Sequence, residues 1–406
     1  MPIVDLILGV LCLPVFLVSS YLFFITVGSF LLRKKCDTGA AALRIALVMP
    51  AHNEELQIAA CVKHALQADY PRDRFDVFVI ADNCNDATAD VARRAGATAF
   101  ERHDTQLRGK GQAIDWFLRA QRELLAQYDA IALVDADTKV DRRFLAEVSA
   151  SLSHPEVTVV QGWHGVSNPE ANWRAALTHA AFTLINGLRP AGRSHWGGTA
   201  DLKGNGMAFR RDILFRYGWP AHSIVEDIEF STRLLLDGTL VHYNPDAITI
   251  SEMPTTRRQA EPQRRRWESG RWATVKLFVP MLLAAFAKHR RWRYLDAALE
   301  FLVPPLSLFL LMQAVLLIAA LWFRPAWAWP IAACLAITAA YVFSGLYQYR
   351  APRSVWLGLF AVPLFLLWKI PFYIRLTFSR GPQSWERTQR HAELEQRNND
   401  PSDKKG

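Results

Sequence analysis

The stretch Ala132–Asp141, ALVDADTKVD, decides how the rest of the chain is interpreted. It overlaps an apolar run, Ile131–Val134, which predicts a buried strand, because strands inside a parallel sheet are continuously apolar. Open α/β sheets bind ligands at the carboxyl ends of their strands. Asp135 and Asp137 directly follow this strand, so we predict that they hold Mg²⁺ or Mn²⁺ against the phosphates of a nucleotide. A surface turn that happens to contain two aspartates is the common alternative.

The composition predicts a membrane-associated chain with a polar central domain. The 406 residues carry a formal net charge of +9, and 51% of them are hydrophobic. Apolar residues concentrate at 1–32 and from about 272 to 378. The five cysteines show neither metal-ligand spacing nor a disulfide framework, which fits a reducing compartment. The excess of Lys and Arg suits a membrane surface and anionic nucleotides, and no basic–aromatic module of a nucleic-acid binder is present.

The first apolar run predicts a retained membrane anchor. Ile3–Leu32 is longer than the roughly 20 residues that cross a bilayer, and Arg33, Lys34 and Lys35 follow it. A signal peptide has its basic residues before a shorter run. By the positive-inside rule, we expect the N-terminus outside and the following domain in the cytoplasm.

Three further spans are predicted in the C-terminal third, kinked by prolines at 304, 305, 363 and 371: Phe301–Phe323, Trp327–Tyr347 and Val355–Ile374. Trp272–Ala287 is either interfacial or another span. Four spans would leave the tail outside, whereas its Lys and Arg residues favour the inside, so the side of the C-terminus stays open. The predicted division is an anchor, a catalytic domain, interfacial helices, membrane helices and a polar tail, at 1–35, 40–255, 256–295, 296–378 and 379–406.

Polar residues follow two further predicted strands, Arg44–Met49 and Phe75–Ile80. They are candidates for nucleotide contacts in a doubly wound sheet: Pro50, His52, Glu54 and Asp82. Helix capping is the ordinary alternative for their neighbours Asn53 and Asp86.

Lys110 lies in a glycine-flanked basic turn, RGKG, before a helix predicted at 112–125. Such a turn can bind phosphate at a helix N-terminus, although the spacing of a P-loop is absent. A plain basic turn is the alternative.

The second half of the polar region contains candidate acceptor and catalytic residues. Gly204 and Gly206 flank Asn205 in a loop that would permit close approach of a sugar ring, or that is an ordinary turn. Glu226 and Asp227 open a predicted helix. Glu226 lies at a capping-box position, and Asp227 has no such local role, although any Asp in a first turn gains from the helix dipole.

Gln263, Arg266 and Trp267 share one helical face at positions i, i+3 and i+4. Their alternative is an amphipathic helix on the bilayer, with arginines at the headgroups and tryptophan at the interface. Both roles can hold together, because opposite faces of one helix can contact lipid and the site.

Taken in order, these motifs resemble those of the family 2 glycosyltransferases of GT-A fold. Within that family they are most similar to the membrane synthases of cellulose, hyaluronan and poly-N-acetylglucosamine. The resemblance rests on the order D, D-x-D, E-D, Q-x-x-R-W and covers residues 44–275. It implies an α/β, Rossmann-like catalytic domain that binds a nucleotide-diphospho-sugar, combined with transmembrane helices.

The resemblance also implies a role for each candidate residue. Asp82 and the loop with Pro50, His52 and Glu54 would contact the uridine. Lys110 and Asp135 would lie near the nucleotide, and Asp137 would ligate the metal. Asp227 would be the general base, with Glu226 beside it tending to raise its pKa. The acceptor side would be formed by Gly204, Asn205, Gln263, Arg266 and Trp267.

The expected function is therefore a metal-dependent, inverting glycosyltransferase that uses a UDP-sugar. It would sit in the plasma membrane, the inner membrane of a bacterium, with a cytoplasmic catalytic domain, and make a β-linked cell-surface polysaccharide. A single addition to a membrane lipid or lipid-linked carrier is the alternative. A silent nucleotide-sugar binding protein would need no base, and a transporter would be expected to show internal repeats, which the sequence lacks.

Overall fold

The computed structural model describes residues 2–32, 42–219, 225–253 and 274–378. The chain divides into two compact units, which we treat separately. The sheet unit comprises Lys34–Asn168, Thr199–Thr274 and Gly381–Gly406, and the helical unit comprises Met1–Arg33, Pro169–Gly198 and Val275–Arg380. The segment Pro169–Gly198 lies inside the predicted catalytic domain, 40–255, but it packs with the helical unit.

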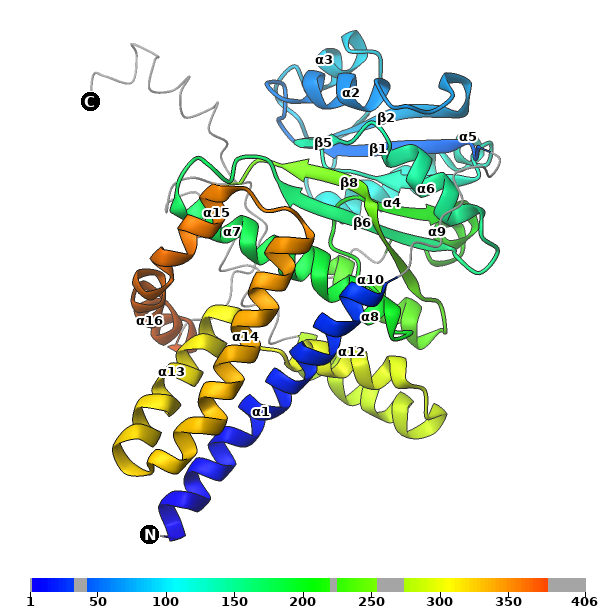
Figure 1. Cartoon of the computed structure of the whole chain (residues 1–406). Coiled ribbons are helices and arrows are strands. Elements are labelled where there is room, and N and C mark those ends of the chain that lie inside the picture. The colour runs from blue at the N-terminus through cyan, green and yellow to red at the C-terminus, as the bar shows by residue number, and fades with distance from the viewer. Residues whose placement is uncertain (1, 33–41, 220–224, 254–273, 379–406) are drawn as a thin grey trace, which may run out of the picture. The chain divides into compact units, whose positions relative to one another are not determined.

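The sheet unit is built on a mixed sheet with strand order β3-β2-β1-β4-β7-β6-β8-β5 (Figure 1). The strands are β1 (Ile45–Ala51), β2 (Phe75–Asp82), β3 (Thr98–Arg102), β4 (Ala130–Leu133), β5 (Thr138–Val140), β6 (Val159–Val166), β7 (Met207–Arg210) and β8 (Val241–Ser251). The first four in that order are parallel. β7 is antiparallel to β4 and β6, while β8 is parallel to β6 and antiparallel to β5.

The helices of this unit follow the strands along the chain: α2 (Ile58–Leu66), α3 (Thr88–Arg94), α4 (Lys110–Ala120), α5 (Arg122–Leu125), α6 (Phe144–Ser153), α9 (Arg211–Tyr217) and α10 (Glu226–Leu236). α2 and α6 cover the continuously apolar strands, and the core between them includes Ile45, Val79, Ala132 and Phe144, each no more than 1% exposed. The predicted helix at 112–125 is interrupted at Gln121, where α4 ends and α5 begins.

The sheet brings the predicted nucleotide residues to one edge. β1 and β2 are in register to their carboxyl ends, with Ala51 opposite Ala81, and β4 ends at Leu133 on the other side of β1. β7 begins at Met207 opposite Leu133, so the loop that precedes β7 ends at this same edge. β2 and β3 follow β1 on one side of it, whereas β4 lies on the other side, so the strand order reverses between β1 and β4. Ligands of open α/β sheets usually bind at such a reversal.

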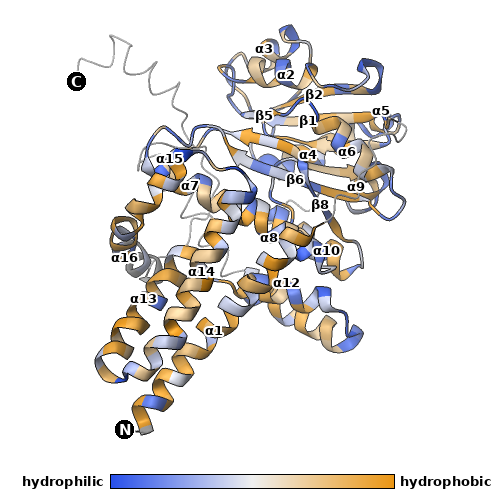
Figure 2. Cartoon of the chain, in the orientation of Figure 1, coloured by the Kyte–Doolittle hydropathy of each residue, from blue (hydrophilic) through white to orange (hydrophobic). Residues whose placement is uncertain are grey.

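The helical unit contains the candidate membrane spans. Its helices are α1 (Pro2–Leu31), α7 (Trp173–Thr183), the π-helical turn η2 (Leu184–Leu188), α8 (Arg189–His195), a helix at 274–289, α12 (Trp292–Leu302), α13 (Leu306–Phe323), α14 (Ala328–Gln348), α15 (Arg353–Gly358) and α16 (Val362–Phe378). Within the described ranges, four helical segments are long and apolar enough to cross a membrane: Ile3–Leu31, Leu306–Phe323, Pro325–Gln348 and Arg353–Pro371. Figure 2, which colours the ribbon by residue hydropathy, shows many hydrophobic residues along α1 and α13.

Local chemistry decides where helices of this unit begin and end. The span predicted at Phe301–Phe323 is broken, not kinked: α12 ends at Leu302 and α13 begins after the two prolines. α7 begins at Trp173, because the Asn172 side chain accepts hydrogen bonds from the amides of Arg174 and Ala175, both at 3.0 Å.

A buried ion-pair network joins the helices of this unit. The Tyr21 hydroxyl of α1 donates to Asp296 of α12 at 2.9 Å, and Asp296 also pairs with Arg193 of α8 at 2.9 Å. Arg189 pairs with Glu300 at 3.0 Å. Because removing one partner would leave a buried charge uncompensated, this network favours one arrangement of α1, α8 and α12.

Candidate active site

The two aspartates of the D-x-D motif lie on a tight turn at the end of β4. The amide of Thr138 donates to the carbonyl of Asp135 at 3.0 Å, so Asp137 occupies the third position of a four-residue turn. Both aspartate side chains are partly exposed, whereas Ala136 and Thr138 are buried. β4 ends at Leu133, one residue before the predicted end at Val134, and both carboxylates lie at the ligand edge.

Lys110 joins this turn to the loop before β7. Its ammonium group donates to the Asp135 carboxylate and to the carbonyl of Gly204. Gly109, with φ of 117°, permits the sharp entry into α4 that places Lys110 at the first position of the helix. A cation and a helix N-terminus thus lie beside the first aspartate, an arrangement that favours an anionic ligand such as a diphosphate.

Asp82 lies at the end of β2 in a hydrogen-bonded setting. Arg102, at the end of β3, donates to Asp82 Oδ1 at 2.6 Å, and the pair is largely buried. His52 Nδ1 lies 2.7 Å from the backbone carbonyl of Asp82, which links the loop after β1 to the end of β2. The predicted uridine contacts Asp82 and His52 are therefore adjacent. Arg102 adds to the predicted residues; no sequence motif singled it out, since a lone Arg at a strand end is common.

Pro50 and Glu54 flank His52. Pro50 lies in β1, opposite Ile80 of β2. The amide of Glu54 donates to Thr88 Oγ1 at 2.8 Å, and its carbonyl accepts from the amides at the start of α2. The backbone of Glu54 thus fixes the loop between β1 and α2.

Glu226 and Asp227 lie in the first turn of α10, and Asp227 lies next to Gly204 in the loop before β7. A Cβ on Gly204 would lie 3.2 Å from Asp227 Oδ2, so this glycine lets the loop approach the carboxylate closely. Burial raises the pKa of the Asp227 carboxyl, although Lys110 and backbone hydrogen bonds oppose the shift. Burial also raises the pKa of Glu226, to about 7; Lys110 opposes this shift, whereas the negative charge of Asp227 adds to it. Raised carboxyl pKa values are typical of catalytic bases.

Asn205 faces the D-x-D turn. Its side chain is 2% exposed, accepts from the amide of Asp135 at 3.1 Å and donates to Thr138 Oγ1 at 2.7 Å. Gly204 and Gly206 on either side have φ of 75° and 65°, a left-handed conformation that favours glycine. Gly204 therefore lies beside Asp227, as an acceptor loop would, while the Asn205 side chain contacts the turn.

The remaining acceptor candidates, Gln263, Arg266 and Trp267, lie outside the described residues and stay predictions. So does the part of the predicted interfacial segment before residue 274.

The donor set at the turn suits a hard divalent cation. Across the described parts of the chain, no cluster of three or more His, Cys, Asp or Glu residues could hold a metal ion. Asp135 and Asp137 supply two carboxylates one residue apart, and Mg²⁺ typically takes one or two carboxylates while substrate phosphates and water complete its shell. The residues present therefore fit a cation that binds together with a nucleotide.

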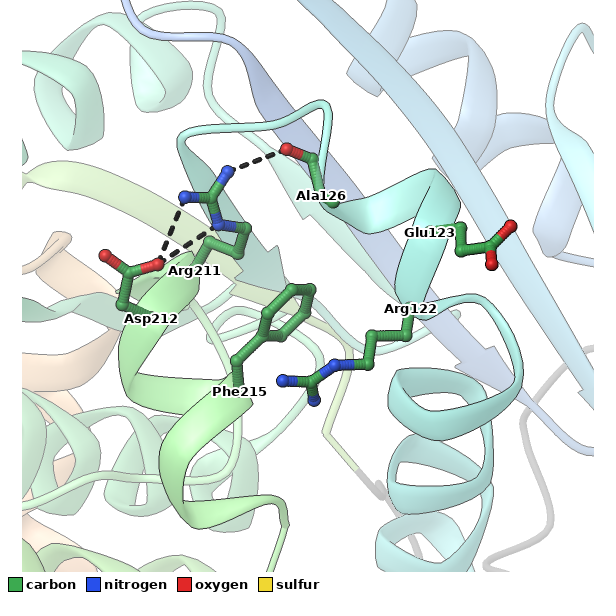
Figure 3. A pocket seen from close by; sticks show the side chains of 6 residues that line it. All are labelled: Arg122, Glu123, Ala126, Arg211, Asp212 and Phe215. Atoms are coloured by element: carbon green, nitrogen blue, oxygen red, sulfur yellow. Dashed lines mark hydrogen bonds and ion pairs between the residues drawn. The ribbon is translucent and has the colours of Figure 1, made fainter.

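A shallow cavity of about 480 Å³ lies elsewhere in the sheet unit and contains none of these residues. Figure 3 shows its lining residues from α5, α9 and the turn after α5: Arg122, Glu123, Ala126, Arg211, Asp212 and Phe215. Arg211 donates to the carbonyl of Ala126 at 2.7 Å and to Asp212 at 3.1 Å. The convergent carboxylates and the lysine are at the sheet edge, so we place the candidate site there.

Comparison with known proteins identifies the family. Residues 42–270 match the family described as "Glycosyltransferase like family 2". The mannosyltransferase PcManGT from Pyrobaculum calidifontis, solved in complex with GDP-Man and Mn²⁺, superposes with a TM-score of 0.54 at 20% identity. This superposition covers 90% of this chain and 99% of that one, and it supports the GT-A fold.

Two curated relatives differ in the class of molecule that their names describe. The beta-monoglucosyldiacylglycerol synthase of Trichormus variabilis is 26% identical over 322 residues, 76% of this chain and 66% of that protein. The poly-beta-1,6-N-acetyl-D-glucosamine synthase of Staphylococcus aureus (strain COL) is 26% identical over 257 residues, 62% of this chain and 60% of that protein. The chain spans about half to two thirds of the length of the curated relatives it matches. The family match, together with the sheet that carries the D-x-D turn, confirms the predicted fold and enzyme class: the chain belongs to glycosyltransferase family 2.

Proposed function

We propose that the chain transfers a sugar from a nucleotide sugar, with a UDP-sugar as the expected donor, to a hydroxyl group at a membrane, with inversion at the anomeric carbon. The observation that carries the proposal is the convergence of Asp135, Lys110 and Asp227 on the loop at Gly204. The Lys110–Asp135 ion pair, expected at the nucleotide, and the Asp227 carboxylate of raised pKa then both lie next to Gly204. A module that only binds nucleotide sugars would need no such base.

The proposed reaction is a single displacement. Asp227 takes the proton of the acceptor hydroxyl while its oxygen forms a bond to the anomeric carbon, and the bond from that carbon to the diphosphate oxygen breaks. Attack opposite the leaving group converts an α-linked donor into a β-linked product. Lys110, held between Asp135 and Gly204, stabilises the negative charge on the departing diphosphate.

A divalent cation would bind Asp135 and Asp137, and when bound it supplies positive charge that neutralises the diphosphate of the leaving group. Mg²⁺ and Mn²⁺ both suit these oxygen ligands. Asp82, fixed by Arg102, would contact the uracil ring, and His52 would support the same loop.

The acceptor has two candidates. A growing β-linked polysaccharide at the cell surface is the first, and the similarity to a poly-N-acetylglucosamine synthase supports it. A membrane lipid that receives one sugar is the second. The longer alignment with a glucosyldiacylglycerol synthase, over 76% of the chain, favours this candidate. In both cases we place the protein in the plasma membrane as a multi-pass protein with its sheet unit in the cytoplasm, since four apolar helices are long enough to span.

The test is release of nucleoside diphosphate by the purified full-length protein. We would assay a panel of UDP-sugars and GDP-sugars with Mn²⁺ or Mg²⁺, in detergent with added membrane lipids, and analyse the length of the product. We expect turnover with one donor and loss of turnover with chelator. A product of one sugar on lipid would identify the second acceptor, and a ladder of chain lengths would identify the first.

The matched variants are Asp227→Asn and Asp212→Asn. Removal of a general base typically costs about 10²- to 10⁴-fold in rate, so we expect that loss in kcat for Asp227→Asn with donor binding retained. Asp212 has an exposed side chain in α9, and its replacement should leave turnover at the wild-type level. Full turnover in Asp227→Asn would overturn its assignment as the base.

A further inference from the structure

A chain of buried polar side chains runs from the interior of the sheet unit to the D-x-D turn. Its members are His164 of β6, Ser251 of β8, Thr138 of β5 and Asn205 of the loop before β7, and none is more than 7% exposed. Thr138 pairs with Ser251 across the antiparallel strands β5 and β8, and their hydroxyl oxygens lie 2.7 Å apart. His164 Nε2 lies 3.0 Å from Ser251 Oγ. Because of this burial, the chain of hydrogen bonds is part of the protein interior and is separated from bulk water.

The Asn205 amide holds both ends of the turn. The amide N–H of Asp135 can only donate, so the oxygen of the Asn205 side chain must face it, and the NH₂ group must then face Thr138. One side chain therefore bonds the first and the last residue of the turn, and Asp137 lies between them. The amide of Thr138 closes the same turn on Asp135 at 3.0 Å.

These contacts allow one consistent set of hydrogen-bond directions that ends at Asp137. Thr138 Oγ1 accepts from Asn205, so its own proton is available for another partner, and Asp137 Oδ1 lies 3.2 Å away. A hydrogen bond to a carboxylate is stronger than one to a hydroxyl, which favours Asp137 as that partner. Ser251 must then donate to Thr138, and His164 Nε2 must carry the proton that it donates to Ser251.

We propose that His164, Ser251, Thr138 and Asn205 form a hydrogen-bond relay that positions Asp137 for its divalent cation. The inference rests on the proposed function, because it takes the cation to bind at the turn. It adds positioning residues that the sequence motifs do not contain. It also gives the buried amide of Asn205 a role in orienting the metal ligand. Burial lowers the pKa of His164 to about 4, so the ring is neutral at physiological pH, and the relay then places its one ring proton on Nε2.

The test compares Thr138, which belongs to the relay, with Thr249, which does not. Thr138→Val removes the relay hydroxyl at nearly constant shape, and Thr138→Ser restores it. Thr249→Val is the matched control, because Thr249 is also fully buried in β8 and its hydroxyl makes only a 3.5 Å contact with a backbone carbonyl. Ser251→Ala removes the next hydroxyl along the relay. Melting temperatures of all four purified full-length proteins are measured beside that of wild type.

The readout is the dissociation constant of Mn²⁺ in the presence of saturating UDP, from the electron paramagnetic resonance signal of free Mn²⁺. Loss of groups that orient a metal ligand typically weakens metal binding about 10- to 100-fold. We expect a loss in this range for Thr138→Val, a smaller loss for Ser251→Ala, and wild-type affinity for Thr138→Ser and Thr249→Val. The affinity for UDP without metal should not change.

Several outcomes would overturn the relay. They are wild-type Mn²⁺ affinity in Thr138→Val, equal losses in Thr138→Val and Thr249→Val, or failure of Thr138→Ser to restore binding. If Thr138→Val does not fold, Ser251→Ala carries the same test, and wild-type Mn²⁺ affinity in that variant overturns the relay. Failure of the wild-type protein to bind Mn²⁺ with UDP would instead overturn the proposed metal-dependent function, and it would remove the basis of the relay with it.

Discussion

Glu226 and Asp227 are adjacent carboxylates, and their negative charges repel each other. The proposed base Asp227 works only when ionised, and its pKa is raised by burial, so activity must be lost at low pH. The pKa of Glu226 is raised to about 7, so this residue gains its charge near neutrality. That charge makes Asp227 more basic. We expect the kcat of the wild-type protein to keep rising through about pH 7 for this reason.

Glu226→Gln removes the ionisation of Glu226 and leaves that of Asp227. Its pH profile should level off at a lower pH than that of wild type, because only the ionisation of Asp227 remains. The measurement is kcat against pH at saturating donor for both proteins. A variant that still gains activity through neutral pH would show that another group titrates there.

At the residue scale, the site residues that could be predicted from the sequence are those that belong to a local motif. Asp135, Asp137, Lys110 and Asp227 each follow a strand or open a helix, and the fold brings them to one region. Arg102, His164 and Ser251 could not be found in this way. Ser251 lies far along the chain from Thr138 and meets it only through strand pairing. A non-local contact leaves no spacing that a single sequence can reveal.

At the scale of elements, strands inside the parallel half of the sheet were predictable, and the short strands β5 and β7 were not. β1, β2 and β4 are continuously apolar, which is the pattern expected of strands covered on both faces. β5 has three residues and β7 has four, and each depends on pairing with a strand distant in the sequence. Such strands are defined by their neighbours in the sheet, so their own residues carry little signal.

The contact between α1 and α8 depends on two glycines of the helical unit. A Cβ on Gly192 would lie 1.9 Å from the carbonyl oxygen of Ile25, and a Cβ on Gly28 would lie 2.8 Å from the carbonyl oxygen of Gly192. The two helix backbones therefore touch directly. Overpacking of this kind typically costs about 1–3 kcal/mol, so Gly192→Ala should lower the melting temperature of the protein in detergent.

Gly9→Ala is the matched control within α1. A Cβ on Gly9 would meet only the Trp327 ring, at an ordinary distance of 3.4 Å, so its melting temperature should be unchanged or raised by the better helix propensity of alanine. Equal melting temperatures of Gly192→Ala and wild type would mean that α1 and α8 can separate at no cost.

At the scale of the whole molecule, the four candidate spans predict which side of the membrane each connecting segment faces. The first span precedes the sheet unit along the chain and the other three follow it, so we expect the N-terminal end of α1 and the turn between α13 and α14 on the same side of the membrane, away from the cytoplasm. Contacts within the helical unit agree with this order. Asp5, near the start of α1, pairs with Arg324 at 2.9 Å and accepts from the Trp327 indole at 3.2 Å. The turn between α13 and α14 therefore lies beside the N-terminal end of α1.

Ala326 of that turn is exposed, and we expect it outside the cell. In intact cells, a membrane-impermeant maleimide should label Ala326→Cys and leave the wild-type protein unlabelled. Ala126→Cys, at an exposed position of the sheet unit, should be labelled only after the cells are permeabilised. Basic residues after the first span favour the same orientation, since they are retained on the cytoplasmic side. Labelling of Ala126→Cys in intact cells would invert the proposed orientation, and it would move the site away from the cytoplasmic pool of nucleotide sugars.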